Sequence, residues 1–161
     1  MKTELRYSII HEVILSHGNV DRAFDLNEYK KLEKKSEKFV KLYNQNIKKI
    51  VELLEKKVGS RKWQYEFVPI YIVDINLEKC YLFSGEKKIN WKGYGDPITI
   101  LLRQEKVMLF TLIHELAHNL IDLETQVKMG EEKAENYIHL DVSQYVWDQL
   151  NIGDWREYIK K

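Results

Sequence analysis

Residues 98–120 read ITILLRQEKVMLFTLIHELAHNL, and this stretch decides how the chain can fold. It begins with five residues of high strand propensity, Ile98 to Leu102, and continues into a pattern typical of a helix. Apolar side chains occur almost all round that helix, as in a helix buried in a protein core. Its polar residues fall on one stripe, at Thr111, His114, Glu115, His118, Asn119 and Asp122. Such a stripe on a buried helix must face a cleft, a polar network or a metal ion.

The stripe contains the pentad His114-Glu115-Leu116-Ala117-His118, which has the form HExxH. Residues four apart on a helix lie about 6 Å apart on nearly the same face, so two imidazoles can converge on one ion. Glu115 is rotated by about 100° from His114, which places it to take a proton from a metal-bound water rather than to bind the metal. The pattern predicts one catalytic zinc ion on His114 and His118, with Glu115 as general base. The alternative is a pair of histidines satisfied by ordinary hydrogen bonds.

A catalytic zinc site needs a third protein ligand and keeps one position for water. Glu124, six residues after His118, lies about 240° round a continuous helix and cannot reach the ion. The helix pattern runs from Glu105 to about Lys128, and a second helix is expected after Met129-Gly130. That helix can run back beside the first. Its early glutamates are the candidates for the third ligand: Glu131, Glu132 and Glu135.

HELAH followed by Glu131-Glu132-Lys133-Ala134-Glu135 resembles the gluzincin metallopeptidases, most closely the minimal soluble ones and more loosely the ImmA/IrrE-type peptidases. The resemblance covers residues 98–146. It implies a zincin-like fold, Glu131 as third zinc ligand and Glu135 as support for a ligand histidine. It also implies that a strand before the active-site helix, here Ile98 to Leu102, pairs with an extended peptide substrate.

The rest of the chain predicts an α+β fold. Apolar spacing favours helices at Thr3–His17 and from about Leu26 to Val58. Aromatic and β-branched residues between 63 and 102 favour several short strands in a small, mostly antiparallel sheet. We therefore expect N-terminal helices, this sheet, the HExxH helix and a glutamate-bearing helix after it. We expect residues 1–161 to form one zincin-like metallopeptidase domain, with residues 1–60 as a helical N-terminal extension packed on it.

Composition excludes several other classes of protein. The formal net charge is +1 with 32% charged residues, so no basic excess indicates nucleic-acid binding. No apolar run reaches the ~20 residues that cross a membrane, and the N-terminus lacks the pattern of a signal peptide. Cys80 is the only cysteine, which excludes an internal disulfide and a cysteine-rich zinc finger. We expect a cytoplasmic protein, in which the N-terminal extension holds the peptidase latent as in a zymogen or recruits a partner.

Two other functions remain open from the residues alone. Glu78-Lys79-Cys80-Tyr81-Leu82 superficially resembles the cysteine motif of peptide deformylases, which would make Cys80 a zinc ligand. A non-catalytic interaction protein with a closed structural metal site is the other, although such a site has no need of Glu115. A peptidase also requires a group that stabilises the oxyanion, for which Tyr137 and His139 are the candidates.

Overall fold

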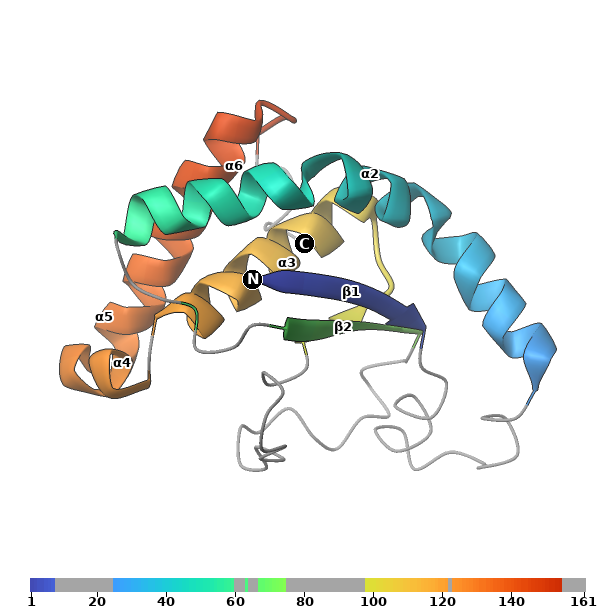
Figure 1. The fold of residues 1–161 in the computed structure, drawn as a ribbon, viewed down its shortest axis with the longest axis horizontal. Coiled ribbons are helices and arrows are strands. Elements are labelled where there is room, and N and C mark those ends of the chain that lie inside the picture. Colours follow the sequence, from blue (N-terminus) through green and yellow to red (C-terminus); the bar gives the residue numbers. More distant parts are fainter. Residues whose placement is uncertain (8–24, 60–62, 64–66, 75–97, 122, 155–161) are drawn as a thin grey trace.

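The computed structural model describes residues 1–7, 25–59, 63, 67–74, 98–121 and 123–154. Helices make up most of the described chain, and they lie over a small sheet (Figure 1). The elements in chain order are β1 (Lys2–Tyr7), α2 (Leu26–Val58), β2 (Phe67–Val73), β3 (Ile98–Leu101), α3 (Glu105–Leu120), α4 (Leu123–Met129), α5 (Glu131–Asn136), the π-helical segment η3 (Tyr137–Ser143) and α6 (Gln144–Leu150).

The described sheet has three strands in the order β1-β2-β3, and both pairings are parallel. The prediction of a mostly antiparallel sheet is therefore wrong. Parallel neighbours need a crossover connection, and the chain between β1 and β2 contains the long helix α2. The sequence of β2, FVPIYIV, is almost continuously apolar and mostly buried, as is typical of a parallel strand covered on both faces.

The first strand, β1, was not predicted from the sequence, because its residues also fit a helical pattern. Residues 3–7 were expected to begin a helix, but in the structure they form β1 and alternate between exposed and half-buried side chains. The helix prediction is wrong for this part, and residues 8–17 lie outside the described residues. The short strands expected between residues 79 and 91 also lie outside them. The strand expected at Ile98 to Leu102 is confirmed as β3.

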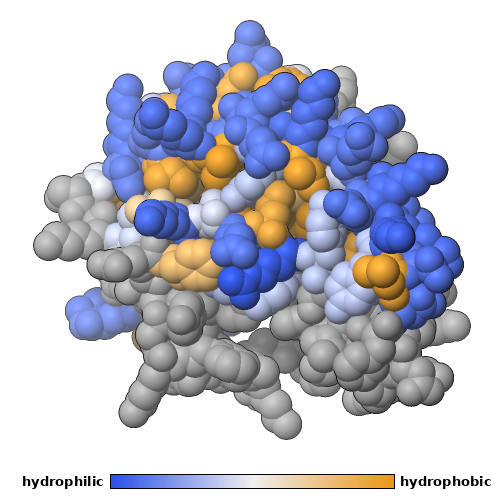
Figure 2. All heavy atoms as spheres, turned by 45° about the vertical axis from the view of Figure 1, so that its right-hand side comes forward, coloured by the Kyte–Doolittle hydropathy of each residue, from blue (hydrophilic) through white to orange (hydrophobic). Residues whose placement is uncertain are grey.

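Helix α2 has the bounds that its apolar spacing predicts. Asp25 accepts a hydrogen bond from the backbone N–H of Asn27 at the start, and Gly59, with φ of 90°, ends the helix. Its buried stripe contains Leu32, Phe39 and Tyr43, and the core continues through Ile50 and Leu54. Among the coloured residues of Figure 2, hydrophilic side chains cover most of the upper surface, and hydrophobic ones show between them. Because the buried side chains of α2 lie on one stripe, the helix is amphipathic, with one face in the core.

Helix α3 lies in the centre of the core, in contact with α2, β3 and η3. It ends at Leu120, because Ile121 has an extended backbone with φ −91° and ψ 109°. The expectation of one continuous helix to about Lys128 is therefore wrong. The chain turns here without a glycine, and α4 starts in a new direction. This turn allows residues of α4 to approach the end of α3.

After α4 the chain reverses at Gly130, whose φ of 81° is a conformation that side-chain-bearing residues rarely adopt. Residues 131–150 then run as α5, η3 and α6 without a break. Asn151 ends this run in the left-handed conformation. The expected second helix is thus confirmed, with a π-helical middle that the sequence pattern did not indicate.

The described part of residues 1–60 belongs to the central structure. β1 pairs with β2 along its whole length, and α2 packs against α3 and α6. Removing residues 1–25 would delete a strand of the sheet, so that truncation would test folding rather than latency. No helix in the described part of the chain is long and apolar enough to span a membrane.

A hydrogen bond joins β1 to α2 and provides a test of this arrangement. The hydroxyl groups of Thr3 and Tyr43 lie 2.6 Å apart, and burial raises the pKa of Tyr43. Thr3→Val should cost ~1–3 kcal/mol, because it leaves the buried Tyr43 hydroxyl without this partner. Adding Tyr43→Phe should cost less than it does in the wild-type background. Urea unfolding of the two single variants and the double variant measures this coupling; strictly additive effects would contradict the docking of β1 on α2.

Candidate metal centre

Three potential metal ligands converge where α3 meets α5. Nε2 of His118 lies 3.1 Å from Nε2 of His114 and 3.2 Å from Oε1 of Glu135. Nε2 of His114 lies 3.7 Å from the other carboxylate oxygen, Oε2 of Glu135. Both histidines come from one face of α3, and Glu135 comes from the second turn of α5. No other group of three or more such side chains occurs among the described residues.

The spacing of these atoms fits a zinc ion. With bonds of about 2.0–2.1 Å, tetrahedral zinc holds its ligand atoms about 3.3 Å apart, close to the three separations found here. Two imidazoles and one carboxylate are also a donor set that catalytic zinc sites use. The histidine side chains are mostly buried, whereas 52% of the Glu135 side chain is exposed. The residues therefore fit one zinc ion with a side open to solvent.

Burial keeps one ligand in the state that a metal needs. It lowers the pKa of His114 to about 4, with smaller contributions from His118 and His139. The ring is therefore neutral at neutral pH, as a metal-binding imidazole must be. The ring of His139 contacts two other rings. Its centroid lies 5.6 Å from that of His114 and 5.3 Å from that of Phe110.

Glu115 lies beside the group without being part of it. Burial raises the pKa of its carboxyl above the usual value; His118 opposes this rise and Glu135 adds to it. A carboxylate with a raised pKa holds a proton more strongly than one in water, which suits a general base. The geometry thus brings together three candidate ligands, two from α3 and one from α5, with the separate carboxyl of Glu115 next to His114 on α3.

Gln126 was not identified from the sequence as a residue of the site. From α4 it accepts a hydrogen bond from Nδ1 of His118 at 3.1 Å, and its amide donates to the backbone carbonyls of His118, at 3.0 Å, and of Ile121. On one continuous helix, Gln126 would stand about 12 Å along the axis from His118 and about 80° round it. Only the break at Ile121 brings the two together, and no local signal in the sequence predicted that break.

Glu135, and not the predicted Glu131, lies with the two histidines in the candidate ligand group. Glu131 is the first residue of α5, one helical turn before Glu135, and it is not in the ligand group. Four residues correspond to about 6 Å of helix, so the two carboxylates cannot occupy the same position beside the histidines. Glu132 is exposed and also outside the group. Glu124 pairs with Lys128 at the surface, as expected of a residue that does not reach the site.

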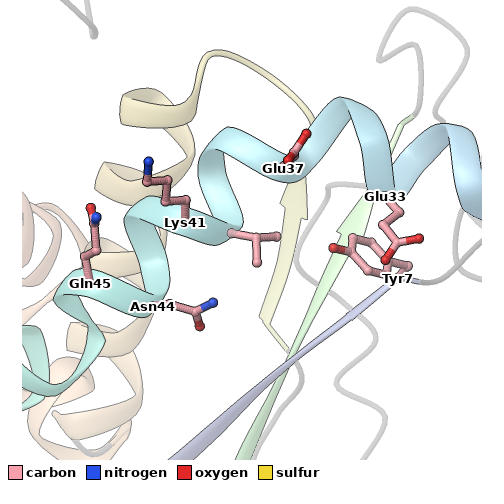
Figure 3. Close-up of a pocket in the computed structure, with 7 residues that line it drawn as sticks. Tyr7, Glu33, Glu37, Lys41, Asn44 and Gln45 are labelled. Atoms are coloured by element: carbon pink, nitrogen blue, oxygen red, sulfur yellow. The ribbon is translucent and has the colours of Figure 1, made fainter.

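Other candidates lie elsewhere or outside the described residues. Cys80, the ligand of the deformylase-like alternative, is among the residues not described. A surface groove of about 430 Å³ lies between Tyr7 and one face of α2 (Figure 3). Glu33, Glu37 and Lys41 line it, but the described residues of its lining include no histidine or cysteine and none of the ligand group. We therefore base the function on the histidine group.

Comparisons of the chain with protein-family models, with curated proteins and with solved structures found no match. The functional argument therefore rests on the site itself.

The ligand assignment predicts which carboxylate the metal requires. Wild-type protein should hold about one zinc ion, and Glu135→Ala should lose most of it because only two protein ligands remain. Glu131→Ala, one turn earlier on the same helix, is the matched control and should keep its zinc. Elemental analysis of the three proteins, purified identically, measures the stoichiometry. Zinc loss in the Glu131 variant with retention in the Glu135 variant would reverse the assignment.

Proposed function

We propose that the protein is a zinc-dependent hydrolase that cleaves peptide bonds, with Glu115 as its general base. One observation carries the proposal: the candidate ligand atoms of His114, His118 and Glu135 converge beside the half-buried carboxyl of Glu115. A bound zinc ion would supply a Lewis acid and lower the pKa of a bound water. The HExxH resemblance to gluzincins supports peptide bonds as the substrate class.

The chain's own residues divide the work. Glu115 takes the proton from the attacking water and returns it to the leaving amine, for which its raised pKa is favourable. His114 and His118 hold the metal from a helix that is fixed in the core, so their positions change little during the reaction. Glu135 closes the ligand set from the half-exposed side.

His139 is better placed than Tyr137 to stabilise the oxyanion. His139 lies four residues after Glu135, on the same face of the helical run, and its ring neighbours that of His114. Tyr137 is two residues from Glu135, on a different face, and packs against the hydrophobic core. We assign the oxyanion role to His139 as part of the proposal.

β3 is the proposed binding edge for an extended peptide. In the described sheet it is an outer strand, paired on one side with β2, and it precedes α3 directly. A substrate strand added to its other edge would be held by backbone hydrogen bonds. This arrangement supports a polypeptide substrate rather than a small ester or amide.

Glu115→Gln separates catalysis from metal binding. The amide keeps the shape of the side chain but cannot accept the proton, so we expect hydrolysis to fall by ~10²- to 10⁴-fold. Zinc content should stay at the wild-type level, since Glu115 is not a ligand. The measurement is cleavage of fluorescently labelled casein by zinc-loaded protein, followed by mass spectrometry of the products.

Glu124→Gln is the matched control, because this exposed glutamate pairs with Lys128 away from the site. It should cleave casein at the wild-type rate. A formyl-methionyl peptide, assayed in parallel, distinguishes the deformylase-like alternative: removal of the formyl group without cleavage of casein would favour that reaction. Full activity of the Glu115 variant, or of wild type after chelation of its zinc, would refute the proposed mechanism.

A further inference from the structure

Gln126 makes contacts that determine its own orientation. Its Nε2 lies within hydrogen-bonding reach of two backbone carbonyl oxygens, those of His118 and Ile121. Carbonyl oxygens only accept hydrogen bonds, so the NH₂ end of the amide must face them. The other end, Oε1, then faces the imidazole of His118 at 3.1 Å from Nδ1. The network permits only this orientation of the amide.

The orientation of Gln126 in turn determines which nitrogen of His118 carries the proton. An amide oxygen can only accept, so Nδ1 must be the donor in this hydrogen bond. A neutral imidazole has one N–H, and Nε2 of His118 is therefore left with its lone pair. That lone pair faces the site, where Nε2 lies 3.2 Å from Oε1 of Glu135.

We propose that Gln126 is a positioning residue that holds His118 in the tautomer able to bind metal through Nε2. The inference rests on the metal site of the proposed function, but it concerns a residue outside the ligand set. In this tautomer Nε2 of His118 and the carboxylate of Glu135 are two acceptors facing each other. The hydrogen bond from Nδ1 to Gln126 therefore keeps the lone pair of Nε2 directed at the site and available to a metal ion.

The two histidines are held in different ways. Nδ1 of His118 has Gln126, whereas Nδ1 of His114 is buried and has no hydrogen-bond partner within the described residues. His114 is instead packed beside the rings of His118 and His139. A hydrogen bond to the second nitrogen commonly orients a ligand histidine and increases its basicity. Of the two histidines, only His118 has such a hydrogen bond within the described residues, and its partner, Gln126, lies on α4.

A glutamine combines two tasks here, of which a glutamate could perform only one. Its oxygen accepts from His118, while its NH₂ group satisfies carbonyls at the end of α3 that have no partner within the helix. Gln126→Glu keeps an acceptor for Nδ1 but loses both N–H donors. Gln126→Met, of similar length, loses the acceptor and the donors. These two variants therefore differ in the contact to the imidazole and share the loss at the end of α3.

The first test reads the tautomer directly, without metal. Long-range ¹H–¹⁵N NMR of metal-free protein at about pH 8, where an ordinary imidazole is neutral, should show His118 protonated at Nδ1 in wild type and Gln126→Glu. Gln126→Met should lose this preference. A role confined to the end of α3 would leave the tautomer of His118 unchanged in every variant. Protonation of His118 at Nε2 in the wild type would overturn the inference.

The second test measures the consequence for metal binding. Titration with Co²⁺, followed by its visible absorption, should show affinity ~10- to 100-fold lower in Gln126→Met than in wild type. Gln126→Glu should bind Co²⁺ at least as tightly as wild type, although both variants lose stability in urea to a similar extent. Equal affinity in Gln126→Met and wild type, or equal losses in both variants, would overturn the inference. Failure of wild type to bind Co²⁺ would instead refute the metal site. The tautomer measurement uses metal-free protein, so it tests the role of Gln126 separately from metal binding.

Discussion

Burial of α3 is the constraint on which the rest of the structure depends. Eight of its side chains lie in the core, and the helix contacts α2, β3 and η3 on different sides. A helix enclosed in this way can carry polar side chains only where other polar groups meet them. His114 and His118 meet Glu135 from α5 and Gln126 from α4. The two helices that follow α3 in the chain thus each bring one polar side chain to its histidines.

The features that depend on local pattern could be predicted from the sequence. The bounds of α2 follow from a capping aspartate, an apolar stripe and a terminal glycine, and the convergence of His114 and His118 follows from helical spacing. The features that depend on distant partners could not. β1 becomes a strand only by pairing with β2, 60 or more residues away, and its pairing makes the sheet parallel. The break at Ile121 has no glycine or proline to mark it, so the contact of Gln126 with His118 could not be predicted.

The choice between two glutamates of α5 depends on how the run 131–150 packs. Its buried side chains include five at steps of four: Ala134, Ile138, Val142, Val146 and Leu150. In an ideal α-helix each such step drifts about 40° round the axis, which would carry the ends of this series to opposite faces. The wider π-helical turn of η3 reduces that drift, and the hydroxyl of Ser143 donates to the carbonyl of Ile138, five residues earlier. One side of the whole run can then pack on the core. Ala134 sits in that interface, which places its neighbour Glu135 at the histidines.

Glu115 is the residue that a purely structural metal site does not explain. A buried carboxyl has a raised pKa because the charged form loses its hydration, and this burial opposes folding when the group is ionised. Its position on the helix prevents it from joining His114 and His118 as a ligand, so it gains no bond to a metal in return. A structural centre would be at least as stable with an apolar residue there. A reaction that moves a proton beside a bound metal would account for the carboxyl, and for that reason the arrangement favours the proposed hydrolase over a closed structural site.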